Sequence, residues 1–258
     1  MSLRPKKSLG QHFLTDDNII EKIAEAIPAG EGDRVIEIGP GTGALTEALV
    51  ERFDDLVAVE LDQRAIEVLE QKFDGLVIYH ENILDADWSK LSTGKSRTHV
   101  VGNLPYYITS QILFSLLENR SVMADALLMM QKEVAERIVA NIRTKDYGIL
   151  SVQTQLFATP EILFPVSRHC FSPQPNVESA VLKLTFDKGA LACSDDHLKT
   201  VVRTAFNQRR KKLSNALKPI VSKDRLPEGF DFDKRAEAWE PSEYEKLTVR
   251  LVEDGILT

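Results

Sequence analysis

The chain has 258 residues, 43% of them hydrophobic and 28% charged, and its formal net charge is -7. This composition is typical of a soluble globular protein with a main domain and a smaller second one, and it excludes disordered and fibrous proteins. No apolar run approaches the roughly 20 residues of a membrane span, and no signal-type segment follows the basic N-terminus, so we expect a cytoplasmic protein. The two cysteines and five histidines lack any ligand spacing, so no metal site is expected.

Short apolar runs rich in Val, Ile and Leu alternate with segments that carry apolar residues at helical spacing. This alternation predicts an α/β fold, in which a mostly parallel sheet has helices on both faces. Ligands of such sheets bind at the carboxyl ends of the strands, near the switch in strand order. The predicted strands are 34–38, 56–60, 76–79, 98–102, 126–130 and 179–185, and the predicted helices between them are 45–53, 64–73, 108–117 and 133–142.

The first predicted strand runs into a glycine-rich turn, Gly39-Pro40-Gly41-Thr42-Gly43, and then into a helix. Glycines at such a turn let the backbone approach a ligand closely and leave the amides of the helix N-terminus pointing at it. A nucleoside cofactor is therefore expected here. The spacing from Gly39 also fits the fingerprint of dinucleotide-binding proteins, so the glycines alone are compatible with both NAD and S-adenosylmethionine.

The second predicted strand ends in Val59-Glu60-Leu61-Asp62. An acid about 20 positions past the first glycine, at the end of a strand, is placed to accept hydrogen bonds from ribose hydroxyls. We assign that role to Glu60, with a solvated strand end as the alternative. Asp62 is better explained as the cap of the following helix.

The fourth predicted strand ends in Asn103-Leu104-Pro105-Tyr106 and favours S-adenosylmethionine. An exocyclic adenine amine is a poor nucleophile, because its lone pair is delocalised into the ring. The side-chain oxygen of Asn103 and the backbone carbonyl of Leu104 could hold its two hydrogens and direct the lone pair at a methyl group. Tyr106 would stack on the extruded base. Positioning would then carry most of the catalysis.

The pattern changes after Phe186, where Asp187-Lys188-Gly189 forms a plausible linker, and helical stretches follow at about 196–217 and 241–252. We therefore predict two domains: a Rossmann-like catalytic domain at 1–187 and a small helical domain at 188–258.

Two basic segments stand out against the acidic composition. Arg4, Lys6 and Lys7 lie near the N-terminus, and no Asp or Glu occurs from His197 to Lys223. The second segment favours phosphate contact. Four consecutive cations on the predicted helix would wrap around it, so only part of the cluster could bind RNA. The candidate RNA-binding residues are Arg203, Arg209, Arg210, Lys211 and Lys212.

Five segments in this order resemble the ribosomal RNA adenine dimethyltransferase family, and in particular its housekeeping small-subunit (16S) enzymes rather than the macrolide-resistance methyltransferases. The segments are 8–14, 37–46, 103–106, 171–181 and 205–213. The resemblance implies S-adenosylmethionine as cofactor. It also implies two methyl transfers to each of two adjacent adenosines near the 3′ end of 16S ribosomal RNA, within an immature small ribosomal subunit. A monomer is the expected form.

The same resemblance implies roles for individual residues. Gly39 would approach the methionine part of the cofactor, Glu60 would hold its ribose, and Asn103 would anchor the target amine and lie against the cofactor. Phe171 would face Tyr106 across the target base. The residues expected to close over the cofactor are Gln11, His12 and Leu14.

One position departs from the family. After the third predicted strand the family usually has an acid that contacts the cofactor adenine, whereas this chain has Asn82. The Asn82 side-chain oxygen can still accept that hydrogen bond, but without charge assistance the bond should be weaker. A shift in register that gives the role to Asp85 is the alternative.

Three other functions compete with this interpretation. An NAD-dependent oxidoreductase would need a catalytic Tyr/Lys or His/Asp set, which the sequence does not offer. A non-catalytic RNA-binding assembly factor would not need Asn103, Tyr106 and Phe171. A DNA adenine methyltransferase stays open, because phosphate contacts alone do not distinguish DNA from RNA.

Overall fold

The computed structural model describes Lys6, residues 10–92, Gly94 and residues 97–257. The chain splits into two compact units, the first formed by Met1–Ala135 and Glu161–Phe186 and the second by Glu136–Pro160 and Asp187–Thr258. The predicted domains divide the chain one residue later, after Asp187, and assign 136–160 to the first domain. In the structure this segment carries helix α7 (Ile149–Phe157), which packs against the C-terminal helices α8 (Asp195–Asn207) and α10 (Pro241–Glu253).

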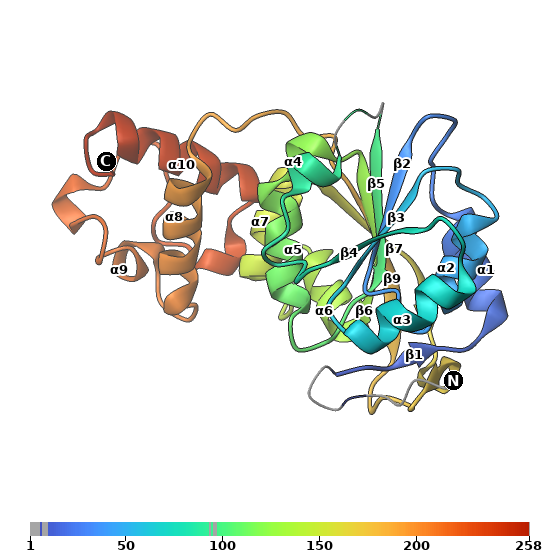
Figure 1. Cartoon of the computed structure of the whole chain (residues 1–258). Coiled ribbons are helices and arrows are strands. Elements are labelled where there is room, and N and C mark those ends of the chain that lie inside the picture. Colours follow the sequence, from blue (N-terminus) through green and yellow to red (C-terminus); the bar gives the residue numbers. More distant parts are fainter. Residues whose placement is uncertain (1–5, 7–9, 93, 95–96, 258) are drawn as a thin grey trace. The chain divides into compact units, whose positions relative to one another are not determined.

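A seven-stranded sheet is the centre of the first unit (Figure 1), and its strand order is β4-β3-β2-β5-β6-β9-β7. The pairs from β4 to β6 are parallel, and β9 runs antiparallel to β6. This order confirms the predicted α/β fold with a mostly parallel sheet. The strands are β2 (Arg34–Ile38), β3 (Leu56–Glu60), β4 (Val77–His80), β5 (Thr98–Asn103), β6 (Asp125–Gln131), β7 (Thr159–Val166) and β9 (Ser179–Thr185).

The central strands are continuous apolar runs because helices cover both faces of the sheet. Every residue of β3 is buried, as are Val35 to Ile38 of β2. In Figure 1, α1 to α3 lie on one face of the sheet, and α4 and α5 lie on the other. The helices are α1 (Asp17–Glu25), α2 (Ala44–Val50), α3 (Gln63–Lys72), α4 (Trp88–Leu91) and α5 (Thr109–Glu118), with the 3-10 turn η2 (Arg120–Val122) and α6 (Lys132–Ile138) following.

A second, two-stranded sheet ties the N-terminal segment to a distant loop. Strand β1 (Phe13–Leu14) pairs antiparallel with β8 (Phe171–Ser172), and Leu14 is the partner of Phe171. The 3-10 turn η3 (Arg168–Cys170) precedes β8. Strands of two residues carry no periodicity, so the sequence did not predict this sheet.

The second unit is helical, as predicted for its C-terminal part, and it has an aromatic core. Tyr147, Trp239 and Tyr244 are fully buried. The Tyr147 hydroxyl donates to the Trp239 carbonyl over 2.8 Å, which ties the two segments of the unit together. Its further elements are α9 (Leu213–Ala216), η4 (Lys223–Arg225) and η5 (Ala236–Ala238).

The helix predicted at 196–217 is not continuous: α8 forms its first part, α9 covers Leu213–Ala216, and residues 208–212 between them are not helical. Helix α8 ends at Asn207, and the cations at 209–212 lie in turns and a β-bridge instead of on a helix. The physical reason is a non-local pairing. Lys212 forms a β-bridge with Arg235, and the Leu213 amide donates to the Lys234 carbonyl over 2.8 Å. These hydrogen bonds replace those that a continued helix would make.

Candidate active site

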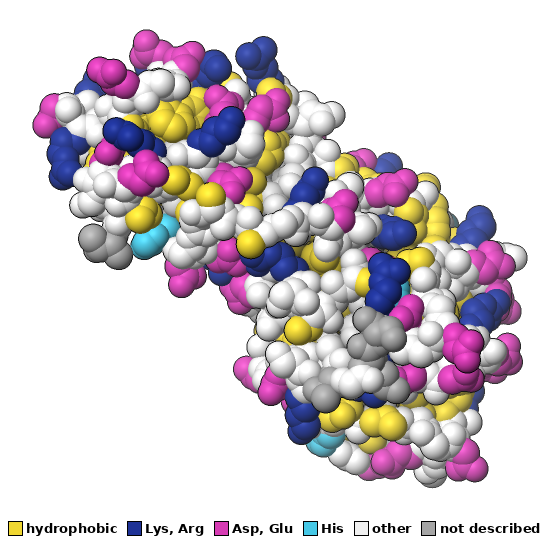
Figure 2. All heavy atoms as spheres, turned by 90° about the horizontal axis from the view of Figure 1, so that it is seen from above, with side chains coloured by type: hydrophobic (Ala, Val, Ile, Leu, Met, Phe, Trp, Pro, Cys, Tyr) yellow, Lys and Arg dark blue, Asp and Glu magenta, His cyan; other side chains and the backbone are white. Residues whose placement is uncertain are grey.

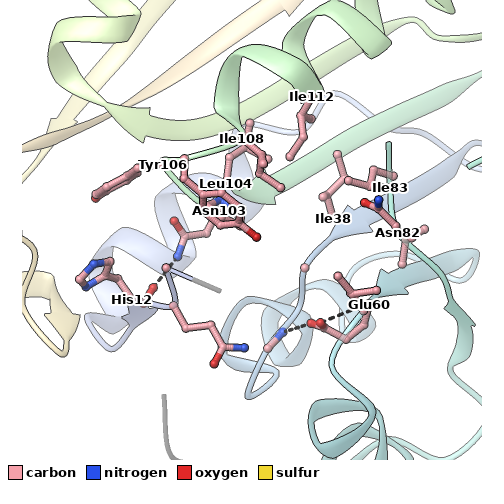
Figure 3. A pocket seen from close by; sticks show the side chains of 18 of the residues that line it. His12, Ile38, Glu60, Asn82, Ile83, Asn103, Leu104, Tyr106, Ile108 and Ile112 are labelled. Carbon is pink, nitrogen blue, oxygen red and sulfur yellow. Dashed lines mark hydrogen bonds between the residues drawn. The ribbon is translucent and has the colours of Figure 1, made fainter. Parts of the chain in front are cut away.

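A cavity opens at the carboxyl ends of β2, β3, β4 and β5, where the strand order reverses between β2 and β5 (Figure 3). This is the location that α/β sheets use for ligands. Eight of the residues predicted to form the site line this cavity. They are Gln11, His12, Gly39, Glu60, Asn82, Asn103, Leu104 and Tyr106.

The turn between β2 and α2 lets the backbone come close to a ligand. Gly39 has a φ of 64°, and a Cβ atom built on it would have no neighbour within 4 Å. Gly41, with a φ of 56°, lies against Phe13, whose ring would be 2.9 Å from a Cβ atom. A side chain at Gly39 would therefore project into the cavity, in the space that the predicted cofactor needs.

Glu60 is buried, with 7% of its surface exposed, so the alternative of a solvated strand end is excluded. One carboxylate oxygen accepts from the Gly41 amide over 3.1 Å, and the other accepts from the Leu61 and Asp62 amides, both over 2.8 Å. Each carboxylate oxygen has two lone-pair sites, so the first oxygen keeps capacity for a further donor. Glu60 thus fixes the glycine turn and faces the cavity.

Asp62 caps α3, as predicted: its side chain accepts from the Arg64 amide over 3.3 Å. The Arg64 guanidinium also binds both carboxylate oxygens, with distances of 3.0 and 2.6 Å. This partner, with Lys6 at 3.3 Å, holds the pKa of Asp62 well below its usual range. Gln11 donates to the same carboxylate over 3.4 Å, so Asp62 also anchors the N-terminal segment.

Asn103 has a defined amide orientation. Its Nδ2 donates to the His12 backbone carbonyl over 2.9 Å, which leaves Oδ1 as the acceptor. The adjacent Leu104 amide donates to the Met129 carbonyl over 3.0 Å, and no described residue donates to the Leu104 carbonyl. Two consecutive residues that line the cavity therefore each carry a neutral acceptor, which is what the predicted binding of an exocyclic amine needs.

Tyr106 offers one face of its ring at the same end of the cavity. The ring stacks against His12, with centroids 5.7 Å apart and planes inclined by 23°, and its hydroxyl is 2.7 Å from the Ser179 hydroxyl. Burial raises the pKa of Tyr106, which keeps the phenol neutral. Figure 3 shows Tyr106, His12 and Asn103 at one end of the cavity, and Glu60, Asn82 and Ile83 at the other.

His12 connects three segments of the site. Its backbone carbonyl accepts from Asn103, its ring stacks on Tyr106, and its Nδ1 donates to the Pro173 carbonyl over 2.7 Å. Pro173 lies just after β8, so His12 holds the loop that carries Phe171. The resemblance identified His12 as a cofactor-closing residue; its contacts with Tyr106 and Pro173 have no signal in the sequence.

Two predicted residues do not line this cavity. Phe171 is 4% exposed and Leu14 is 5% exposed, and both belong to the hydrophobic core cluster. Among the described residues, the ring stacked on Tyr106 is that of His12 instead of Phe171. The second stacking face assigned to Phe171 therefore stays a prediction.

Asn82 lines the cavity, whereas Asp85 does not and instead binds the Asn82 side chain. The Asn82 Nδ2 donates to the Asp85 carboxylate over 2.9 Å, and its Oδ1 accepts from the Leu84 amide over 3.2 Å. The amide is thereby oriented, and Oδ1 retains a second lone pair. Of the two candidates for contact with the cofactor adenine, Asn82 is the one at the cavity wall.

Several residues at the site were not identified from the sequence. Leu61 and Ile83 follow the polar ends of two strands and give the cavity apolar walls, and Leu61 is 49% exposed. An exposed Leu directly after a buried strand is a signal that could have been used. Glu37 in β2 is fully buried and lines a small adjacent cavity with Gly39 and Asn103. Desolvation raises its pKa to about 8.

The predicted RNA-binding cations differ in their surroundings. Arg203, Arg210 and Lys211 are exposed, and no described residue pairs with them. Arg209 instead forms an ion pair with Glu237 over 2.7 Å, and Lys212 pairs with Asp233 over 3.0 Å. Near the N-terminus, Arg4 and Lys7 lie outside the described residues.

Within the described part of the chain, no cluster of three or more His, Cys, Asp or Glu residues has the geometry to hold a metal ion. In the same residues, no helix combines the length and the apolar character that crossing a bilayer requires.

The chain is similar to known proteins over nearly its whole length. A family model described as ribosomal RNA adenine dimethylase matches residues 2–236. The chain is 47% identical, over 254 residues, to ribosomal RNA small subunit methyltransferase A of Salinibacter ruber, covering 96% of this chain and 85% of that protein. It is 45% identical to the protein of that name from Parabacteroides distasonis, covering 96% and 94% of the two chains.

Two solved structures share the fold. A dimethyladenosine transferase from Plasmodium falciparum has a TM-score of 0.81 at 26% identity, with 95% of this chain and 98% of that one covered. The 23S rRNA methyltransferase ErmE has a TM-score of 0.70 at 26% identity, with 93% and 99% covered.

Proposed function

The chain belongs to the ribosomal RNA adenine dimethylase family, and we propose that it methylates N6 of two adjacent adenosines near the 3′ end of 16S ribosomal RNA. The enzyme is an S-adenosylmethionine-dependent ribosomal RNA adenine dimethyltransferase. Family membership sets aside the NAD-dependent oxidoreductase. The oriented acceptor pair of Asn103 and Leu104 is the observation that carries the proposal.

The residues around the cavity fit S-adenosylmethionine. Gly39 leaves space where a Cβ atom would stand, which suits close approach of the methionine part. Glu60 has acceptor capacity for ribose hydroxyls, and Leu61 and Ile83 provide apolar walls for an adenine ring. Asn82 would accept a hydrogen bond from the adenine amine. Gln11 and His12 would cover the bound cofactor.

When bound, S-adenosylmethionine supplies an electrophilic methyl group. The protein's part is to position the nucleophile. The target base would stack on Tyr106, and Oδ1 of Asn103 and the Leu104 carbonyl would accept the two amine hydrogens, so that the lone pair points into the cavity. Because a neutral phenol and two neutral acceptors surround the amine, no strong base is required. The alkylated amine is acidic enough to lose its proton to water.

The substrate would be an immature small ribosomal subunit, with the protein acting as a cytoplasmic monomer. Arg203, Arg210 and Lys211 are exposed and suited to contact phosphates. Arg209 and Lys212 would contribute less, because each already has an acidic partner. Phe171 would supply the second stacking face for the base.

The experiment that tests the function is methyl transfer from labelled S-adenosylmethionine to unmethylated small ribosomal subunits, followed by nucleoside analysis of the RNA. We expect N6,N6-dimethyladenosine at the two adjacent positions. Absence of this product, with cofactor binding retained, would overturn the proposal in favour of a non-catalytic assembly factor. Product on DNA but not on the subunits would favour the DNA adenine methyltransferase.

A further inference from the structure

Tyr107 is an exposed aromatic residue at the opening of the active-site cavity. The chain has two Trp, five Tyr and eleven Phe residues, all within the described part. Among them Tyr107 is the one whose side chain is mostly exposed, with 58% of its surface accessible. It nevertheless lines the cavity together with Asn103, Leu104 and Tyr106. Every other aromatic side chain of the protein is at least partly packed away from solvent.

The position of Tyr107 matters more than its exposure. Single exposed apolar side chains are ordinary on protein surfaces. Figure 2 shows hydrophobic side chains in separate patches between charged and polar ones on one face of the molecule. Tyr107 differs because it directly follows Tyr106, on which the target base would stack, and because it borders the same cavity. Tyr side chains suit such places, since the ring is apolar and the hydroxyl tolerates water.

The backbone at Tyr107 is held in the turn between β5 and α5. The Ile108 amide donates to the Pro105 carbonyl over 3.2 Å, and the Thr109 hydroxyl donates to the same carbonyl over 3.1 Å. The ring of Pro105 also restricts the backbone at the start of the turn. Tyr107 therefore projects from a fixed point, and its Cα atom is only about 3.8 Å from that of Tyr106.

The N-terminal segment supports the Tyr107 ring at one edge and leaves the rest of it open. Gly10 has a φ of 57°, and a Cβ atom built on it would lie 3.1 Å from Cδ1 and 3.5 Å from Cε1 of Tyr107. A glycine allows both this conformation and this close approach. No described residue stacks on the Tyr107 ring or forms a hydrogen bond with its hydroxyl. The ring is thus available to a ligand at the opening of the cavity.

The proposed substrate brings a second base to this opening. When one of two adjacent adenosines enters the cavity, its neighbours stay bonded to it through the phosphodiester backbone. Extruding the target base also breaks the stacking between that base and its neighbours. A neighbouring base is then left with an open face. Stacking on an aromatic side chain replaces the lost contact for any base, because every base has a π-face.

We propose that Tyr107 is a substrate-binding residue that stacks on the base next to the target base. The proposal rests on the proposed function and extends it: Tyr106 receives the target base, and Tyr107 receives the neighbouring one. Stacking on Tyr107 offsets part of the free energy that base extrusion costs. It also fixes the point at which the RNA backbone enters the cavity, which helps to place the target amine before Asn103.

Two substitutions at the same position test this role. Tyr107→Phe keeps an aromatic face, whereas Tyr107→Leu keeps an apolar side chain without one. Neither should change the melting temperature, because the side chain is mostly exposed and its hydroxyl has no partner among the described residues. Methyl transfer is measured at several concentrations of unmethylated small ribosomal subunits with S-adenosylmethionine in excess. We expect Tyr107→Phe to keep the wild-type kcat/KM and Tyr107→Leu to lose at least about fivefold, the lower end of the range for one base–aromatic stack.

Val77→Ala is the matched control, because it removes an exposed apolar side chain that does not line the cavity. It should keep the wild-type kcat/KM, and an equal loss in this variant would overturn the proposal. Equal values of kcat/KM for Tyr107→Phe and Tyr107→Leu would also overturn it. A third contrary result is weaker binding of S-adenosylmethionine by Tyr107→Leu in calorimetric titration without RNA. The ring would then cover the cofactor together with Gly10 and Gln11 instead of binding RNA.

Binding of the variants to the subunits separates this inference from the proposed function, because it does not require methyl transfer. Suppose that the wild type formed no dimethyladenosine, but Tyr107→Leu bound the subunits at least about fivefold more weakly than Tyr107→Phe. The proposed function would then be rejected, and a stacking contact between Tyr107 and RNA would be retained. Dimethyladenosine formation by the wild type, with equal kcat/KM in the two variants, would reject the role of Tyr107 alone.

Discussion

The side chain of Asn103 donates a hydrogen bond to the backbone carbonyl of His12 over 2.9 Å. The contact joins the end of β5 to the N-terminal segment, which the sequence separates by 91 positions. Because a carbonyl can only accept, the nitrogen of the Asn103 amide is committed to it. The oxygen is thereby left free to accept, and in the proposed mechanism it is the acceptor for the target amine.

This orientation makes Asn103 the most sensitive side chain of the site. Asn103→Ala should lower turnover by about 10²- to 10³-fold, as expected for loss of one oriented group at the reacting centre. Asn103→Asp should be similarly impaired, because a carboxylate has no hydrogen to donate to the His12 carbonyl. Single-turnover methyl transfer measures the loss, and calorimetric titration should show cofactor binding mostly retained. A full rate in either variant would remove Asn103 from the mechanism.

The pair Asn82 and Asp85 predicts the effect of a reciprocal exchange. Asn82→Asp alone should not tighten cofactor binding. Nδ2 of Asn82 lies 2.9 Å from the Asp85 carboxylate, so a carboxylate in its place would be repelled by that of Asp85. Asn82→Asp with Asp85→Asn restores the hydrogen bond with reversed polarity and places a charged acceptor at the cavity wall. Since charge-assisted hydrogen bonds are roughly twice as strong as neutral ones, affinity should rise about fivefold.

Equilibrium binding of S-adenosylmethionine checks this exchange, with Asp85→Asn as the single-variant control. If the double variant bound the cofactor no more tightly than wild type, Asn82 would not be the residue that contacts the adenine amine.

Glu60 is expected to be intolerant even of an isosteric change. Its oxygens accept three backbone amides, so Glu60→Gln must place an NH₂ group against at least one amide N–H. Hydrogen bonds to charged groups contribute about 1.5–3 kcal/mol, so cofactor affinity should fall by about 10- to 100-fold. Glu67→Gln, on the exposed face of α3, is the matched control and should bind normally. Equal affinities in the two variants would contradict a role for Glu60 in the cofactor site.

The sequence predicted most of the sheet and much of the site. The predicted strands 34–38, 56–60 and 179–185 coincide with β2, β3 and β9, because continuous apolar runs between turn residues are a local signal. Glu60 was found because it ends such a run, and Asn103 and Tyr106 because they lie in the segment that follows one. The resemblance to the family extended this to Gln11 and His12.

The features that escaped prediction depend on contacts between distant segments. No local pattern shows that Asn207 ends α8, since the cause is the pairing of Lys212 and Leu213 with residues 234–235. The run of four cations likewise gives no sign that Arg209 binds the Glu237 carboxylate and the Thr144 carbonyl. Glu37 was overlooked because it stands among the apolar residues of its strand. Its burial follows from the parallel sheet, since helices cover both faces of the sheet.

Glu37 predicts a pH dependence of stability. Burial raises its pKa in the folded protein from 4.5 to about 8, so the native state keeps a proton that the unfolded chain has lost between these values. The folded state is therefore favoured most below about pH 4.5, and this contribution declines as pH rises to about 8 and then levels off. Glu37→Gln mimics the protonated form and accepts from Thr46 as Glu37 does, over 2.7 Å.

Urea unfolding at several pH values measures the difference between Glu37→Gln and wild type. Subtracting the two curves cancels the other carboxyl groups, including Asp62, whose lowered pKa acts in the opposite direction. The stability advantage of the variant should grow from about pH 4.5 to pH 8. A difference that is independent of pH would show that Glu37 is ionised in the native protein.

Arg209 and Arg210 are neighbours in sequence, yet the structure predicts opposite consequences for their loss. Arg209 is held by Glu237 and Thr144, so Arg209→Gln should lower the free energy of unfolding by about 1 kcal/mol, or about 2–4 °C in melting temperature. Arg210 is exposed and has no ion-pair partner among the described residues, so Arg210→Gln should leave the melting temperature unchanged and lower the salt slope of RNA binding by about 1. Calorimetry and salt titration of both variants separate the two roles. A fall of about 1 in the salt slope for both variants would mean that Arg209 also contacts RNA directly. An unchanged melting temperature in Arg209→Gln would mean that its contacts with Glu237 and Thr144 do not stabilise the fold.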